Sequence, residues 1–215
     1  MPEAFGLTIP TRLADVCDPS RLALIVYDMQ VGIVDQIATG REILARTKRL
    51  VDAARAGGYR IFFTRHVSLP NRLAGIGALR RAMIWQHNDD PEQLAVPFHP
   101  NAPTTAIVPE LEPSPDEVVI DKITMSCFAG TYLDIALRDA KLEAFAIAGI
   151  ALEIGIEPSV RHGCDLNYVP VVVADACGYA DEAAYRRALE GFAFTGEAIV
   201  TDTATLAPVL ATPAR

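Results

Sequence analysis

Short runs of apolar, often β-branched residues alternate with segments of helical periodicity over most of this chain, and no other feature constrains its fold as strongly. Strand-like runs occupy residues 22–27, 59–64, 118–121, 144–148, 169–174 and 198–201. Helical periodicity lies between them, over residues 39–56, 131–140, 154–166 and 181–194. Strands separated by helices form βαβ units, which build parallel sheets covered by helices on both faces. The alternation therefore predicts an α/β protein with a largely parallel central sheet.

The helix predicted over residues 39–56 carries signals at both ends. Thr39 and Glu42 have the spacing of a capping box, and Gly57 and Gly58 follow the last turn. Between these signals, apolar residues recur on one face. We expect the Thr39 side chain to cap the first turn.

The composition is that of an ordinary globular protein. Of the 215 residues, 51% are apolar and 21% are charged, which suffices for a core without disulfides or a structural metal. We therefore expect a single domain over residues 1–215. The 27 acidic residues outnumber 19 scattered basic ones, for a net charge of −8, so neither nucleic acid nor a membrane surface is expected as a partner.

The sequence also bears on location. The most apolar charge-free run, residues 144–152, is about half as long as a membrane-spanning helix. Residues 1–17 lack the basic start and apolar core of a secretion signal. The cysteines form no C-x-x-C pair and have no histidine at zinc-ligand spacing; they are Cys17, Cys127, Cys164 and Cys177. We expect a cytoplasmic protein with reduced thiols and no metal site.

Residues 66–117 interrupt the alternation of strands and helices. They hold eight of the fifteen prolines and the only tryptophan, Trp85. A long irregular insertion in a compact domain is more often functional than passive. We expect a lid or a subunit interface here, with a short helix over residues 79–86.

Polar residues follow several of the predicted strands. Asp28 follows the first, His66 the second and Lys122 the third. Ligands of open parallel sheets bind at the carboxyl ends of the strands, so Asp28 and Lys122 are expected to meet there as an acid or base and its charged partner. Each could instead be a helix cap or a solvated turn residue, and His66 could be a packed imidazole.

Three segments, taken in order, resemble the isochorismatase-like hydrolase superfamily, which includes the cysteine amidohydrolases. They are LALIVYDMQVGIV (22–34), DKITMSCFAGTYLD (121–134) and AFAIAGIALEIGIEPSVRHGCDLNYVPVVVADACG (144–178). The resemblance covers nearly the whole chain except the proline-rich insertion. It implies a three-layer α/β/α, Rossmann-like fold around a mostly parallel six-stranded sheet.

The same resemblance implies a catalytic site. The superfamily uses an Asp, a Lys and a Cys, and Asp28 and Lys122 match the first two, whereas Gly155 stands at the position of the cysteine. Glycine has no atom that can attack a carbonyl, so the covalent route of the amidases is not expected. Isochorismatases also carry glycine there, and vinyl ether hydrolysis needs only a proton donor and water. This likeness implies that Asp28 is the general acid and that Lys122 orients it, while Gly155 only leaves space in the site.

We expect a pocket for a small, anionic substrate, with no cofactor and no metal. A cis peptide bond is implied between Ile150 and Ala151, and the Ile154 and Gly155 amides are expected to face the pocket from a helix N-terminus. The expected substrate contacts are Gln30 of the Asp-x-Gln motif, His66, Trp85, Phe128, Ile150, Ala151 and Ile154.

Two other interpretations stay open. The chain could be a non-catalytic small-molecule binding protein on a hydrolase scaffold, or an amidohydrolase that uses Cys127, five residues after Lys122. A homo-dimer or tetramer is expected, in which Trp85 lines its own pocket or that of a neighbour.

Overall fold

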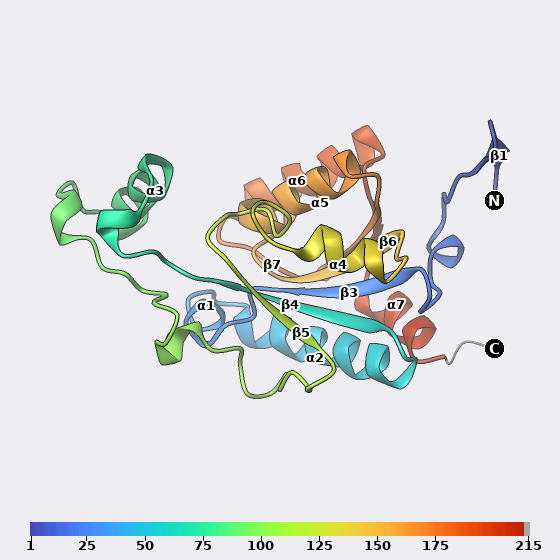
Figure 1. Cartoon of the computed structure of the whole chain (residues 1–215), viewed down its shortest axis with the longest axis horizontal. Helices are drawn as coiled ribbons and strands as arrows, with labels where there is room; N and C mark the ends of the chain where they lie inside the picture. The colour runs from blue at the N-terminus through green and yellow to red at the C-terminus, as the bar shows by residue number, and fades with distance from the viewer. Residues whose placement is uncertain (213–215) are drawn as a thin grey trace.

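The computed structural model describes residues 1–212, which are arranged around a six-stranded sheet (Figure 1). In spatial order the strands are β5 (Val118–Lys122), β4 (Arg60–His66), β3 (Leu22–Tyr27), β6 (Ala144–Ile150), β7 (Val169–Gly178) and β8 (Ile199–Thr201). Each neighbouring pair is parallel. The predicted α/β architecture with a mostly parallel six-stranded sheet is confirmed.

Helices cover both faces of this sheet, as Figure 1 shows. On one face lie α2 (Gly40–Ala56) and α7 (Thr203–Leu210), and on the other lie α4 (Leu133–Asp139), α5 (Glu157–Asp165) and α6 (Glu182–Thr195). Side chains along each strand alternate between the two faces. In β3, Leu24 and Val26 join the core beneath α2, whereas Ile25 and Tyr27 join the core beneath α4 and α5.

The predicted elements are found within a few residues of their expected bounds. Four strands run further towards the candidate site than predicted: β4 to His66, β5 to Lys122, β6 to Ile150 and β7 to Gly178. The helix predicted over residues 154–166 starts earlier, as a π-helical turn η5 (Leu152–Ile156) that continues into α5. Sequence analysis missed α7, the short α1 (Val31–Val34), and an antiparallel hairpin of β1 (Glu3–Ala4) and β2 (Leu7–Thr8).

The capping box predicted at the start of α2 is wrong. Thr39 has φ −90° and ψ 2°, not the extended backbone of an N-cap residue, and its hydroxyl has no hydrogen-bond partner among the described residues. Glu42 instead accepts a hydrogen bond from Arg46 at 2.5 Å. The chain enters α2 through a tight contact, because a Cβ on Gly40 would overlap the carbonyl oxygen of Val34.

The first part of the proline-rich insertion projects from the end of β4, away from the body of the molecule (Figure 1), whereas Val108 and Leu111 in its second part are buried in the core beneath α2. We call residues 67–104 the cap. It contains η2 (Asn71–Leu73), α3 (Ile76–Gln86), η3 (Pro91–Gln93) and η4 (Pro103–Thr105), the last of which ends one residue beyond the cap. Helix α3 is the one predicted over residues 79–86. The cap folds back on itself through side chain to backbone bonds, from Asn71 to the Leu94 carbonyl and from Gln86 to both polar groups of the Ala95 backbone.

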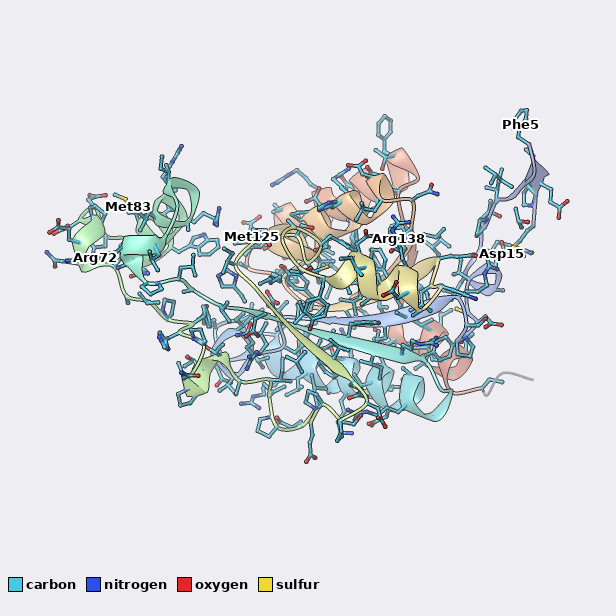
Figure 2. The ribbon with its side chains drawn as sticks, in the orientation of Figure 1. Phe5, Asp15, Arg72, Met83, Met125 and Arg138 are labelled. Atoms are coloured by element: carbon cyan, nitrogen blue, oxygen red, sulfur yellow. The ribbon has the colours of Figure 1, made fainter. Side chains whose placement is uncertain are left out.

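The amino-terminal hairpin lies at the other end of the molecule. Phe5 at its tip projects away from the rest of the chain, and Figure 2 shows it far from Arg72 and Met83 of the cap. Within residues 1–212, no helix is both long and apolar enough to cross a membrane.

Candidate active site

The order of the strands reverses between β3 and β6. From β3 the chain adds β4 and β5 on one side, and from β6 it adds β7 and β8 on the other. Loops leaving the carboxyl ends of two such central strands diverge and leave a crevice between them. Asp28 directly follows β3, and the Ile150–Ala151 step ends β6. The candidate catalytic residues therefore lie at the place where this topology opens the sheet.

Lys122 reaches Asp28 from the edge of the sheet. It is the last residue of β5, two strands away from β3, and its long side chain spans the end of β4. The Lys122 Nζ and Asp28 Oδ2 atoms are 2.7 Å apart in an ion pair. Asp28 is 4% exposed and Lys122 3% exposed, so the pair is almost fully withdrawn from water. Such a pair is stable only if its remaining polar atoms also find partners.

Thr64 supplies one of these partners. Its hydroxyl donates to Asp28 Oδ1 at 2.6 Å and accepts from the Asp28 backbone N–H at 3.2 Å. These bonds fix a residue whose backbone is left-handed, at φ 48°. Each carboxylate oxygen offers two acceptor positions, so Asp28 retains capacity on both oxygens for a ligand.

Tyr27 and Thr124 complete the shell around Lys122. The ammonium donates to the Tyr27 hydroxyl at 2.8 Å and to the Thr124 carbonyl at 3.2 Å, and with Asp28 this accounts for its three protons. It also lies 4.3 Å from the centre of the Tyr27 ring. The Tyr27 hydroxyl donates in turn to the Met125 carbonyl. The result is a fixed array of charges and dipoles.

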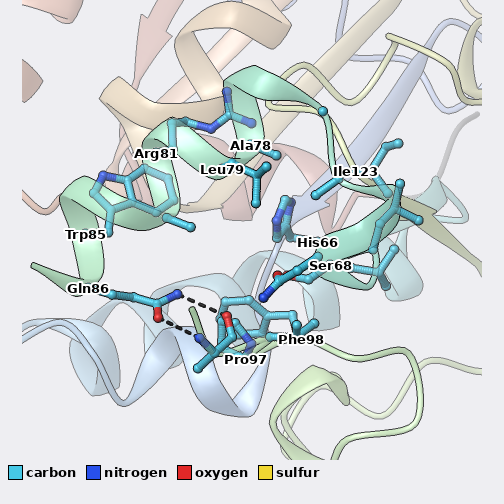
Figure 3. A pocket seen from close by; sticks show the side chains of 18 of the residues that line it. His66, Ser68, Ala78, Leu79, Arg81, Trp85, Gln86, Pro97, Phe98 and Ile123 are labelled. Carbon is cyan, nitrogen blue, oxygen red and sulfur yellow. Dashed lines mark hydrogen bonds between the residues drawn. The ribbon is translucent and has the colours of Figure 1, made fainter. Parts of the chain in front are cut away.

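Asp28 opens onto a cavity of about 680 Å³, which we call the main cavity. Its walls come from the ends of β3, β4 and β6, from the segment around α1, and from the cap. A second space of about 470 Å³, the cap cavity, adjoins it and lies beneath α3 (Figure 3). The two share five wall residues: Gln36, His66, Trp85, Phe98 and Met125. Both volumes are in the range of small-molecule sites.

His66 stands at the junction of the two cavities. Burial, followed by the positive charge of Lys122, lowers the pKa of His66 to about 4, so the imidazole is neutral at pH 7. The ring meets Phe98 edge to face, with centroids 5.9 Å apart, and Figure 3 shows both side chains beneath α3. A neutral imidazole offers a substrate one donor and one acceptor.

The cis peptide bond expected between Ile150 and Ala151 is present. Both residues line the main cavity, together with Ile154. The expectation that the Gly155 amide faces the pocket is wrong, because this N–H donates to the Ala151 carbonyl at 3.1 Å. The helical turn starts at Leu152, earlier than predicted, so the Gly155 amide is already engaged within it.

Residues 22–205 match the family model of the isochorismatase domain. This chain belongs to the isochorismatase family. It is 28% identical over 188 residues to the ureidoacrylate amidohydrolase of Serratia proteamaculans, covering 79% of this chain and 75% of that protein. It is 30% identical over 166 residues to an uncharacterized isochorismatase family protein of Bacillus subtilis, covering 77% of this chain and 82% of that one. Membership of the isochorismatase family and the similarity to these relatives identify the chain as a hydrolase.

Solved structures share the fold of this isochorismatase-family chain. An isochorismatase family protein from Burkholderia thailandensis has a TM-score of 0.72 at 29% identity, with coverage of 91% of this chain and 97% of that one. An N-carbamoylsarcosine amidase from Thermoplasma acidophilum has a TM-score of 0.71 at 18% identity, with coverage of 85% and 96%. At the lower identity the likeness concerns the fold alone.

Of the residues predicted to form the site of this isochorismatase-family chain, six line the main cavity: Asp28, His66, Trp85, Ile150, Ala151 and Ile154. Trp85 does so from its own chain. Lys122 and Gly155 lie behind the wall, in contact with Tyr27. Two other residues are placed differently from what was expected.

Gln30 and Phe128 do not line either cavity. Gln30 is fully buried, and its amide bonds the backbone N–H and carbonyl of His66 and the carbonyl of Thr105. Phe128 stacks on Tyr168 in the core beneath α4 and α5. The structure thus gives both residues structural contacts in place of the substrate contacts expected of them.

The thiols of this family member lie away from the cavities described above. Cys127 is fully buried, its backbone N–H donates to Ser159, and burial raises the pKa of its thiol to about 12. Burial likewise raises the pKa of Cys17 and Cys164 to about 11 and that of Cys177 further. Thiols with raised pKa values are poor nucleophiles. Among residues 1–212, no three His, Cys, Asp or Glu side chains are grouped to hold a metal ion.

Sequence reasoning missed Tyr27, Thr64, Phe98 and Met125 as site residues. Tyr27 carried a signal, because it is the only residue with a polar atom in the side chain of an otherwise aliphatic strand and it directly precedes Asp28. Thr64 carried a weaker one, as the hydroxyl residue that directly follows the apolar run 61–63. Nothing in the pattern of the insertion singled out Phe98.

Proposed function

We propose that this isochorismatase-family chain hydrolyses a small, anionic molecule without a covalent cysteine intermediate, and that vinyl ether hydrolysis is the reaction its site fits best. The observation that carries the proposal is that the buried Asp28–Lys122 pair opens onto the main cavity while no cysteine lines either cavity. In this proposal Gly155 stands where cysteine hydrolases carry their nucleophile.

The charges around the two cavities support an anionic substrate. Asp28 and Lys122 neutralise each other, and His66 is neutral at pH 7. Arg81 lines the cap cavity and forms no ion pair with any residue from 1 to 212. A substrate carboxylate would therefore meet an available guanidinium in the cap cavity while its reacting group lies beside Asp28.

In this mechanism Asp28 acts as general acid. Asp28 takes its proton from solvent before the first turnover and transfers it to the terminal carbon of the vinyl ether, which leaves an oxocarbenium ion on the ether carbon and the Asp28 carboxylate paired with Lys122. Water adds to that cation, loses a proton to the Asp28 carboxylate, and the hemiketal formed breaks into a ketone and an alcohol. Lys122 stabilises the carboxylate that appears when the proton leaves.

The test is pyruvate release from isochorismate, followed with lactate dehydrogenase and NADH. We expect activity in the wild type and a loss of about 10² to 10⁴-fold in Asp28→Asn, which keeps the shape of the side chain and removes its acid function. In D₂O the pyruvate methyl group should gain one deuterium, because the transferred proton comes from an exchangeable group. Full activity in Asp28→Asn, or pyruvate without deuterium, would contradict the mechanism.

The relatives named as amidohydrolases define the competing candidate. We expect no ammonia release from ureidoacrylate, because an acyl transfer that passes through a covalent intermediate needs a nucleophile in the main cavity. Ammonia release that iodoacetamide abolishes, with the adduct mapped to Cys127, would replace our proposal by the amidohydrolase. A ligand that binds and is recovered unchanged would favour a binding protein.

A further inference from the structure

The space beside Gly155 is already filled by another side chain. A Cβ atom built on Gly155 would overlap the hydroxyl oxygen and Cζ of Tyr27 and would lie 2.7 Å from its Cε1. Folded proteins do not tolerate such approaches, so any side chain at position 155 requires Tyr27 to move. Both residues are buried.

Tyr27 cannot move without losing well-placed contacts. Its ring belongs to the core beneath α4 and α5, and its hydroxyl accepts from Lys122 at 2.8 Å and donates to the Met125 carbonyl. The ring also lies next to the ammonium of Lys122. The Tyr27 oxygen is therefore held between the Lys122 ammonium on one side and Gly155 on the other.

We propose that Tyr27 and Gly155 form a coupled pair in which the Tyr27 hydroxyl occupies the place of a side chain at position 155 and holds the Lys122 ammonium against Asp28. Tyr27 is a positioning residue in this scheme. The inference rests on the proposed function for its catalytic consequence, which is that the site is arranged for proton transfer and closed to acyl transfer.

The hydrogen bonds of the hydroxyl identify this role. Its proton is directed to the Met125 carbonyl, and a lone pair receives a proton of Lys122, so it acts on the substrate through Lys122. Burial and the neighbouring Asp28 carboxylate raise the pKa of Tyr27 well above its usual range, which keeps the hydroxyl protonated. Without that oxygen, one N–H of a buried ammonium would lack a partner.

The steric half of the proposal is tested by thermal unfolding of Gly155→Ala, Tyr27→Ala and the double variant. We expect Gly155→Ala to lower the Tm by roughly 10 °C in the wild type and by a small fraction of that in the Tyr27→Ala background. Gly163→Ala is the matched control, since its Cβ would meet Phe145 instead, and Tyr27→Ala should not relieve its cost. A small Tm loss in Gly155→Ala would overturn the proposed coupling of Tyr27 and Gly155. So would a double variant whose Tm loss equals the sum of the two single losses.

The positioning half is tested with Tyr27→Phe, which removes only the oxygen. We expect a fall in kcat of about tenfold with little change in KM and a shift of the pH–rate profile by about one unit, because one hydrogen bond to a charged group is lost. Tyr168→Phe is the control, because its hydroxyl bonds Asp134 instead of Lys122. An unchanged pH profile would leave Tyr27 a space-filling residue and overturn this half.

A readout independent of turnover separates this inference from the proposed function. The ¹⁵Nζ resonance of the buried Lys122 should move in Tyr27→Phe and stay in place in Tyr168→Phe. If the wild type hydrolyses no enol ether, the proposed function fails, yet the unfolding cycle and this resonance still decide the inference. An unmoved resonance would refute the contact between Tyr27 and Lys122.

Discussion

His66 shows how the wall of a cavity determines the state of a single side chain. Its ring is largely removed from water and lies near the ammonium of Lys122, and both conditions oppose a second positive charge. The imidazole therefore stays uncharged under conditions in which an exposed histidine would titrate. A neutral ring can hydrogen-bond a substrate without adding charge to the site.

The free energy of unfolding should depend on pH through His66. Its folded pKa, about 4, lies below the ordinary 6.5, so the unfolded chain binds more protons between these values. The contribution of His66 to the free energy of unfolding is complete above about pH 6.5 and is lost as the pH falls to 4. It amounts to a total on the order of 3 kcal/mol. Urea unfolding of wild type and His66→Phe across this window measures it.

The difference in stability between wild type and His66→Phe should shrink or reverse towards pH 4. Parallel pH curves for the two proteins would mean that His66 has an ordinary pKa in the folded state. Asp28→Asn should be run alongside, because the carboxylate of Asp28 acts on His66 in the opposite sense to Lys122.

Sequence reasoning located the charged residues of the site but not their surroundings. Asp28 and Lys122 could be predicted because the ends of parallel strands meet at one edge and the motif supplied their roles. The role of Tyr27 could not be predicted in spite of its polar atom, since it depends on which face of β3 the side chain occupies and on the absence of a side chain at Gly155. Gln30 was misplaced because a polar side chain beside a site can bind backbone as readily as substrate.

At the scale of the elements, the segments after β3, β4 and the cap are tied together by one side chain. Gln30 accepts from the His66 N–H at 2.6 Å and donates to the His66 and Thr105 carbonyls, each at 3.0 Å. Backbone bonds from Val31 to Ala106 and from Val108 to Met29 continue the same junction. This explains why α1 and η4 pack together although far apart in the sequence.

Gln30→Glu should weaken the fold strongly at neutral pH. The substitution keeps the shape of the side chain but replaces both amide donors by acceptors that face two carbonyl oxygens at a fully buried position. We expect a Tm loss of roughly 10 °C at pH 7 that partly recovers as the pH falls and the carboxyl group becomes protonated. Scanning calorimetry at several pH values measures this.

Gln30→Met is the matched control for that experiment. It removes the same hydrogen bonds without adding charge, so its Tm loss should not depend on pH in the same way. If both variants unfolded at the temperature of the wild type, Gln30 would not hold the junction.

The strands were predictable because apolar runs of this length identify buried strands, and their parallel order follows from the helices between them. The structure of the cap was less predictable from the sequence. Its prolines favour irregular backbone, and no side chain of α3 is fully buried. The start of η5 was missed because a π-helical turn has no periodic signal of its own.

At the scale of the molecule, the cap leaves apolar side chains in water. On α3, Ile76 is 80% exposed, and Ile84 and Trp85, which also line the main cavity, are 66% and 55% exposed. Apolar side chains grouped on one helix are typical of an interface. We propose that a second copy of this chain covers α3, which keeps the expectation of a homo-dimer or tetramer.

Sedimentation equilibrium should therefore show a dimer or tetramer at micromolar concentration. Ile76→Glu combined with Ile84→Glu should shift the protein towards the monomer while its circular dichroism stays unchanged, because neither side chain is buried within one chain. Phe194→Glu is the control, because Phe194 is an exposed side chain on α6, and it should not change the mass. A wild-type monomer, or an α3 variant that keeps the wild-type mass, would refute an interface at α3.

The junction at Gln30 has a consequence for how such a protein can diversify. Because one side chain binds the last residue before the cap and the first residue after it, the cap is a loop closed at its base, and its interior is not needed to fix where the chain leaves and re-enters the body. The acid and its ammonium partner stand outside that loop. Insertions, deletions or a complete exchange of residues 67–104 can therefore change which substrate is bound, while the reacting groups keep their positions.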